Sequence, residues 1–286
     1  ISGVTQCRSA SPTTGHIDSL GRAFLSIADN GRNEAGDPQL YATRTVLDIN
    51  GKSLAVIDAL GRTIVRYDYD MMGTRLRQHS MEAGERWVLN DAAGQPLRTW
   101  NSRGYAFRME YDELHRPAKS FVRGGTPGEQ HFAAECLFLR ATYGDSAETG
   151  LSEADRRARN LRTKLYRQFD GAGVASTERY DFKGNQLTAA RRFAAVFREA
   201  PDWAGEVPLE FEIFETATAY DALNRAIAVT APDGSVYRPR FNDASQLEAV
   251  DVNIRGAREQ GRPVWSPFVH HINYDAKGQR QVIRYG

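Results

Sequence analysis

A short turn motif, an Asp followed three residues later by a Gly, recurs along this sequence and restricts the folds that it can adopt. An Asp side chain can accept a hydrogen bond from the backbone two residues later, which starts a turn. The Gly can take the positive φ that closes a tight turn without steric cost. The motif occurs at Asp18/Gly21, Asp48/Gly51, Asp58/Gly61, Asp70/Gly73, Asp91/Gly94, Asp170/Gly173, Asp181/Gly184 and Asp275/Gly278. Degenerate copies are Asn101/Gly104, Asn242/Ser245, Asp112/His115 and Asp221/Asn224.

The spacing of these turns predicts the fold class. From Gly51 the turn glycines follow at positions 61, 73, 84, 94 and 104, and the pattern returns at 173 and 184. Steps of 10 to 12 residues correspond to one short strand plus one turn. Between turns the side chains alternate, so that Val65, Tyr67 and Tyr69 share one strand face. We therefore predict a mainly β chain of antiparallel hairpins, forming a continuous curling sheet in which each hairpin contacts its neighbours as in a solenoid.

The strand and turn residues together resemble a known repeat. Aromatic repeat positions are Tyr67, Tyr69, Tyr111, Tyr180, Tyr220 and Tyr274. Gly61–Leu76 and Gly173–Leu187, with their Arg-Tyr strand, Tyr-Asp pair and turn Gly, resemble the consensus of RHS/YD repeats. Three stretches are similar to one branch of that family, the B component of bacterial Tc (insecticidal toxin complex) toxins: Met81–Trp87, Tyr180–Asn185 and Ala219–Arg225. The resemblance spans roughly Asp18 to Gly286.

The resemblance implies a structural function. In Tc toxins the B and C components build a hollow RHS shell that encloses the toxic C-terminal region of the C component and docks onto a pentameric channel, the A component. A chain of this kind is expected to be a secreted, non-catalytic shell-wall segment without cofactors. Its expected partners are the rest of the shell, a C-component-like chain with its cargo and, through regions outside this chain, the A component. The family's self-cleaving aspartate motif and its β-propeller have no match in this sequence.

Two regions interrupt the repeat. Ser152–Leu161 begins with a Ser-x-x-Asp capping pattern followed by helix-forming residues, which predicts a short inserted helix near 152–161. Thr188–Glu199 has helical propensity, but it directly follows a repeat turn where a strand is due, so strand and helix both stay open for 186–199, with strand favoured for Gln186–Phe193. Gly124–Gly128 and Gly256–Pro267 are predicted to be loops.

Composition limits the remaining classes. The 286 residues contain 37 Lys+Arg and 36 Asp+Glu, and the formal charge of +1 argues against a protein that mainly grips nucleic acid or an anionic membrane. With two cysteines, Cys7 and Cys136, the chain is not a disulfide scaffold. It opens on Ile-Ser-Gly-Val, without an initiating Met or signal peptide, and we interpret it as one segment (1–286) of a longer protein, with residues 1–17 as an irregular lead-in.

Candidate catalytic and metal-binding residues are few. His270 and His271 are adjacent, so on a strand they point to opposite faces, and no Cys/His/Asp cluster stands at ligand spacing. Asp233-Gly234-Ser235 is superficially like the motif of aspartic proteases, but its position marks another turn. Cys7 and Cys136 could be nucleophiles beside His16 or His131, although the apolar stretch around Cys136 favours a core thiol. We predict no enzyme, no metal and no cofactor.

The aromatic residues leave a second function open. A stripe of Tyr67, Tyr69, Trp87, Trp100, Tyr105, Phe107 and Tyr111 runs along neighbouring strands. Stacked hairpins bury such rings against one another, but rings exposed on one face would indicate a cell-surface carbohydrate- or protein-binding module. A third alternative, an enzyme with an unrecognised site, requires a pocket with convergent polar groups.

Overall fold

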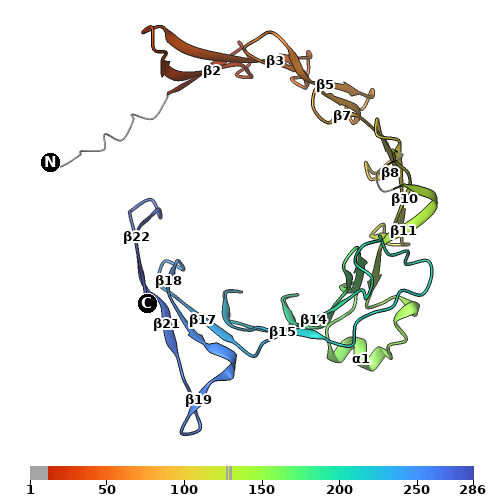
Figure 1. Cartoon of the computed structure of the whole chain (residues 1–286), viewed down its shortest axis with the longest axis vertical. Coiled ribbons are helices and arrows are strands. Elements are labelled where there is room, and N and C mark those ends of the chain that lie inside the picture. The colour runs from red at the N-terminus through yellow and green to blue at the C-terminus, as the bar shows by residue number, and fades with distance from the viewer. Residues whose placement is uncertain (1–11, 127, 129–130) are drawn as a thin grey trace, which may run out of the picture. The chain divides into compact units, whose positions relative to one another are not determined.

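The computed structural model describes residues 12–126, 128 and 131–286, and most of its regular structure is β-strand (Figure 1). Twenty strands belong to one antiparallel sheet, and two more form a small separate hairpin. The predicted mainly β class is therefore confirmed. The chain divides into two compact units, residues 1–109 with 122–135 and residues 110–121 with 136–286.

Strands of the first unit follow one another as hairpins. They are β1 (Thr13–Ile17), β2 (Ala23–Arg32), β3 (Pro38–Leu47), β4 (Ser53–Ile57), β5 (Thr63–Tyr69), β6 (Arg75–Ser80), β7 (Gly84–Asn90) and β8 (Pro96–Asn101). Three further strands contain residues of both units: β9 (Tyr105–Tyr111), β10 (Pro117–Gly124) and β11 (Phe132–Tyr143). Each of β1 to β8 pairs antiparallel with the next strand of the chain.

The second unit continues the hairpins and adds the helices. Its strands are β12 (Leu165–Asp170), β13 (Gly173–Tyr180), β14 (Gln186–Phe193), β15 (Phe214–Tyr220), β16 (Ala226–Thr230), β17 (Val236–Phe241), β18 (Leu247–Asn253), β19 (Arg258–Glu259), β20 (Arg262–Pro263), β21 (Ser266–Tyr274) and β22 (Arg280–Tyr285). Its helices are the 3₁₀ turns η1 (Ala147–Thr149) and η2 (Ile254–Gly256) and the α-helix α1 (Glu153–Ala158). Among the described helices, none is long and apolar enough to cross a membrane.

The inserted helix and the strand at Gln186–Phe193, a segment of helical propensity, both have simple physical explanations. The Oγ of Ser152 accepts a hydrogen bond from the Asp155 amide at 3.1 Å, so the predicted cap starts α1 and the predicted helix is confirmed. The strand favoured for Gln186–Phe193 is also confirmed, as β14. Pairing with β13 and β15 on both sides outweighs the helical propensity of its Ala and Arg residues.

Three sequence expectations need correction or limits. The irregular lead-in was wrong for Thr13–Ile17, because this stretch pairs with β2 and forms the strand before the first repeat turn. Residues 1–11, with Cys7, lie outside the described residues, as does Pro127 in the predicted loop Gly124–Gly128. The predicted loop Gly256–Pro267 contains the β19–β20 hairpin, since Gln260 and Gly261, with φ of 49° and 80°, form a two-residue turn.

Buried side chains are few and are concentrated in the second unit. The buried hydrophobic residues are Val122, Cys136, Leu137, Leu161, Tyr166, Tyr180, Ala194, Trp203, Ala249, Val252 and Ile272. Leu161, Tyr166 and Tyr180 pack together with Leu151 against them, which fastens the helical insertion to the sheet. Elsewhere most strand residues stay partly exposed on both faces. Apart from the helical insertion and the segment around Trp203, which pack on the sheet of the second unit, the described strands therefore form a single layer of hairpins.

Candidate functional site

The repeat Asp residues are engaged by the backbone of their own turns. Asp58 illustrates the geometry: its Oδ1 accepts hydrogen bonds from the amides of Leu60 and Arg62, both at 2.9 Å. The Gly61 amide donates to the Asp58 carbonyl at 3.0 Å, and Gly61 has a φ of 76°. The carboxylate oxygens of the predicted turn residues Asp18, Asp48, Asp70, Asp91, Asp170, Asp181 and Asp275 likewise accept from the backbone two or four residues later.

The glycines of these turns have positive φ, but one turn differs from the others. The turn glycines with positive φ are Gly21, Gly51, Gly61, Gly73, Gly94, Gly173, Gly184 and Gly278. Gly173 has a φ of 134° and pairs directly with Asp170, so that this hairpin has a two-residue loop. The Gly173 backbone also runs close against β14.

Several turns carry an Arg four residues after the Asp, and hydrogen bonds from this Arg lower the pKa of the Asp carboxylate. The hydrogen bond from the Arg22 amide, supported by the Arg22 side chain, lowers the pKa of Asp18. The Arg62 side chain, followed by the Arg62 amide, lowers the pKa of Asp58. Such carboxylates stay ionised and hydrogen-bonded, which suits a structural role rather than proton transfer.

Neighbouring turns are linked to one another along one side of the sheet, the side of the β1–β2 turn in the first unit and of the β13–β14 turn in the second, which we call the turn edge. Arg22 Nη1 donates to the carbonyl of Ile49 at 3.0 Å, which joins the β1–β2 turn to the β3–β4 turn. In the second unit Asn185 Nδ2 donates to Asn224 Oδ1 at 3.0 Å. Arg225 Nη1 donates to Ser245 Oγ at 3.2 Å. The residue four positions after the turn Asp or Asn thus joins its own turn to the next turn on the same edge.

The repeat tyrosines have a structural use that the sequence did not reveal. The hydroxyls of Tyr69, Tyr180 and Tyr274 donate to the backbone carbonyls of Ser53, Leu165 and Leu247 at 2.8, 2.7 and 2.7 Å. Each hydroxyl therefore crosses to an earlier strand of the sheet. The remaining repeat aromatics, Tyr67, Tyr111 and Tyr220, are half-buried.

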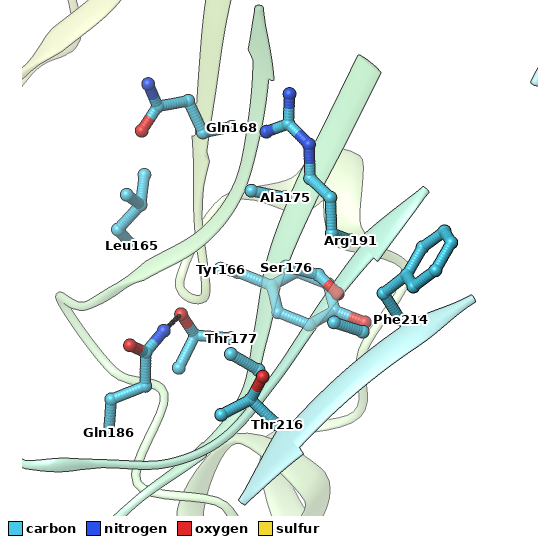
Figure 2. Close-up of a pocket in the computed structure, with 12 residues that line it drawn as sticks. Leu165, Tyr166, Gln168, Ala175, Ser176, Thr177, Gln186, Arg191, Phe214 and Thr216 are labelled. Atoms are coloured by element: carbon cyan, nitrogen blue, oxygen red, sulfur yellow. Dashed lines mark hydrogen bonds between the residues drawn. The ribbon is translucent and has the colours of Figure 1, made fainter. Parts of the chain in front are cut away.

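One shallow pocket, lined by residues of β12, β13, β14 and β15, is a candidate active site by its shape (Figure 2). Its volume is about 270 Å³, and Gln186 Nε2 donates to Thr177 Oγ1 within it. Its one charged lining residue, Arg191, is held by both carboxylate oxygens of Asp170, with Nη1 at 2.8 Å. No carboxylate or imidazole is among the described residues that line this pocket, and a Ser or Thr nucleophile requires such a base for activation.

The other candidate catalytic residues are not assembled into a site. Burial raises the pKa of the Cys136 thiol, whose Sγ faces the Pro201 carbonyl at 3.8 Å, as expected for a core thiol. The Asp233 carboxylate accepts from both the amide and the hydroxyl of Ser235 at 2.9 and 2.8 Å, within a turn. His271 Nδ1 lies 3.9 Å from Glu248 Oε1, and His270 is exposed on the same strand.

A metal site would require several suitable ligands close together. Among residues 12–126, 128 and 131–286, no group of three or more His, Cys, Asp or Glu side chains could hold a metal ion. His16 lies on β1, and its predicted partner Cys7 is outside the described residues. His131 is exposed just before β11.

A cationic pocket that we did not predict lies at the turn edge of the second unit. It is lined by Arg156, Arg157, Asn160, Arg162, Lys164, Asp181, Phe182, Lys183 and Gly184. Basic residues are dense between positions 156 and 164, which is the signal in the sequence, but Lys183 joins them only through the pairing of β12 with β13.

Comparison with known proteins gives relatives in one class of toxin. No model of a protein family matches the sequence. The chain is 25% identical over 223 residues to toxin subunit YenC1 of Yersinia entomophaga, covering 76% of this chain and 21% of YenC1. It is 23% identical over 239 residues to toxin subunit YenC2 of the same organism, covering 77% of this chain and 23% of YenC2. The chain thus spans about a fifth of the length of the curated relatives it matches.

Solved structures of Tc toxin components have the same fold as this chain. A crystal structure of TcdB2-TccC3 matches 96% of this chain and 13% of that chain, with a TM-score of 0.74 and 23% identity. The Photorhabdus luminescens Tc holotoxin pore, with a substitution in TccC3, matches with the same TM-score and 22% identity. The chain therefore has the RHS-type fold of Tc toxin components, as the resemblance of its repeats implied, and it is homologous to the two toxin subunits.

Proposed function

We propose that this chain is a wall segment of a Tc-type RHS shell, which encloses a cytotoxic C-terminal region and helps to deliver it. The observation that carries the proposal is the single layer of hairpins, whose strands leave both faces partly exposed. A wall needs two accessible faces, one toward its contents and one outward, whereas an ordinary globular domain buries one face of its sheet. The matches to toxin subunits and to TcdB2-TccC3 support this assignment.

Large apolar side chains on the exposed surface point to covering partners. They include Leu40, Tyr41, Phe193, Phe211, Ile213, Tyr237 and Phe268, each between 39% and 100% exposed. Exposed apolar side chains such as these are available for contacts with other proteins. Because the chain spans 13% of the matched TcdB2-TccC3 chain, we infer that the rest of the shell, a C-component-like partner and its cargo cover these side chains.

The proposed role is non-catalytic. It agrees with the turn carboxylates held by their own backbone and with the lining of the pocket of Figure 2, in which the described residues include no carboxylate or imidazole. As a part of a secreted toxin complex, the chain would work outside the producing cell and would meet the channel-forming A component through other regions of its parent protein. The proposal that the chain belongs to the B branch rests on the stretches Met81–Trp87, Tyr180–Asn185 and Ala219–Arg225. The two sequence relatives, YenC1 and YenC2, have names that do not place them in that branch.

The first experiment tests enclosure. The full-length parent protein is purified with and without its candidate partner and viewed by electron microscopy, and the cargo is exposed to protease. We expect a closed, hollow particle with internal density and a protected cargo. An open particle with a cleaved cargo overturns the proposal, and an open particle that retains glycans on an array would support the alternative binding module.

A second experiment asks whether one face contacts cargo. Ala217 and Thr218 are adjacent on β15, so Ala217→Lys and Thr218→Lys present the same charge to opposite faces. We expect both variants to assemble and one of them to change the rate of cargo release. Identical release from both variants and the wild type would contradict a cargo-facing wall.

A further inference from the structure

The helical insertion places an excess of positive charge at the turn edge of the second unit. The cationic pocket has a volume of about 350 Å³. Its five cations come from α1, from the segment after α1 and from the β13–β14 turn: Arg156, Arg157, Arg162, Lys164 and Lys183. Two carboxylates partly offset this positive charge: Glu153 lies beside the pocket and Asp181 lines it.

Those two carboxylates are already engaged. Glu153 accepts from Arg157 at 3.2 Å and also pairs with Arg162. Asp181 accepts from the amides of Lys183 and Asn185 at 2.9 and 2.8 Å, so it serves its own turn. The pocket therefore retains a positive charge that neighbouring side chains do not balance.

Three of the cations have no carboxylate partner among the described residues. Arg156 Nη2 donates to the Ser146 carbonyl at 3.1 Å, while its buried Nε has no hydrogen-bond partner. Lys183 Nζ donates to the Ala222 carbonyl at 2.5 Å. The Lys164 ammonium makes no hydrogen bond or ion pair in the described part of the chain, and it lies 2.8 Å from the place where a Cβ on Gly184 would stand.

An apolar side chain stands beside this charge. Phe182, in the same turn as Lys183, is 87% exposed, and Lys183 Nζ lies 5.8 Å from the centre of its ring. An exposed aromatic ring next to unbalanced cations suits a polypeptide that carries both carboxylates and an apolar side chain. An inorganic anion would use the cations and leave the ring uncovered.

We propose that this pocket docks an acidic segment of a neighbouring shell subunit, with carboxylates against Lys164 and Lys183 and an apolar side chain against Phe182. The proposal rests on the proposed shell function. The occupant is a shell subunit rather than cargo because the pocket lies at the turns: Lys183 already reaches the β15–β16 turn. Cargo enclosed by a wall meets the strand faces, whereas the turn edges meet the next part of the wall.

The test compares two equivalent turns in the full-length parent protein. Lys183→Glu is combined with Lys164→Glu, and the control is Lys277→Glu, which occupies the same position in the Asp275–Gly278 turn. Binding of the purified partner subunit is measured at low and high salt. We expect the double variant to weaken binding at least tenfold, with less effect at high salt, and the control to change it less than twofold.

The outcomes separate this proposal from the function on which it rests. If wild-type parent and partner do not associate, the shell function and the docking site both fail. If they associate and the double variant binds as the wild type does, the docking site alone is refuted. If the double variant assembles normally but leaves its cargo open to protease, the occupant is cargo and the proposal is also wrong. Phe182→Ala should weaken binding at both salt concentrations, because its contribution is apolar.

Discussion

Gly173 provides the sharpest test of how these hairpins are held together. A Cβ built at Gly173 would lie 2.2 Å from the Arg192 carbonyl oxygen and 2.8 Å from the Ala194 nitrogen, both backbone atoms. The φ of 134° is also a conformation that L-residues rarely adopt. Gly173→Ala therefore combines backbone strain with overpacking, each worth about 1–3 kcal/mol, for a local loss of about 2–6 kcal/mol.

Gly61→Ala is the matched control. Gly61 also has a positive φ, of 76°, but apart from Gly61 and its two chain neighbours no described residue has an atom within 4 Å of the place where its Cβ would stand, so only the conformational cost of about 1–2 kcal/mol remains. Both substitutions add one methyl group at a repeat glycine with positive φ. Their difference therefore measures the close contact between β13 and β14 together with the more extreme φ of Gly173.

Hydrogen exchange is the appropriate assay because it reports the stability of each hairpin separately. In Gly173→Ala the amides of β13 and β14 should lose protection by at least tenfold more than those of β4 and β5 do in Gly61→Ala, since 1.4 kcal/mol is about tenfold in an equilibrium. The loss should be greatest next to the substitution and should decline along the sheet. Equal losses in the two variants would refute the steric argument.

Three further outcomes follow from other contacts. Tyr180→Phe removes a hydroxyl bonded to β12 and should cost about 0.5–1.5 kcal/mol, whereas Tyr220→Phe, whose hydroxyl has no such bond to the described residues, should be nearly neutral in urea unfolding. Ser152→Ala should destabilise the insertion by about 1 kcal/mol, seen as faster exchange confined to α1. Hydrogen bonds from the Arg191 side chain are the main cause that lowers the pKa of Asp170 in the folded state. The pair therefore stabilises the folded state fully above the unfolded Asp pKa of about 3.9, and this stabilisation is lost as the pH falls through the lower folded pKa. Asp170→Asn should flatten that acid limb in unfolding measured against pH.

The strands and turns were predictable because their cause is local. An Asp and the backbone two to four residues later form the turn by themselves, so a fixed spacing of Asp and Gly reports the hairpins directly. The capped helix at Ser152 is local in the same sense. Even the choice of strand for Gln186–Phe193 followed from the position of the preceding turn rather than from the composition of the segment.

Contacts between hairpins were not predictable in the same way. The hydroxyl of Tyr69 bonds to a residue 16 positions earlier, and Lys183 bonds to one 39 positions later. The cationic pocket likewise depends on the β13–β14 turn lying beside the helical insertion. The β19–β20 hairpin was missed because its Gln-Gly turn lacks the repeat Asp, although Gly261 can take the required positive φ.

These two kinds of contact explain how such a sheet can be stable without a thick core. The turn carboxylates stabilise each hairpin internally, and the tyrosine hydroxyls and turn-to-turn hydrogen bonds join each hairpin to its neighbours. Stability in this arrangement is a sum over neighbouring units, so it does not require either face of the sheet to be covered. Both faces then remain available for partners, and a defect such as Gly173→Ala should weaken the sheet near its own position while distant hairpins keep their protection.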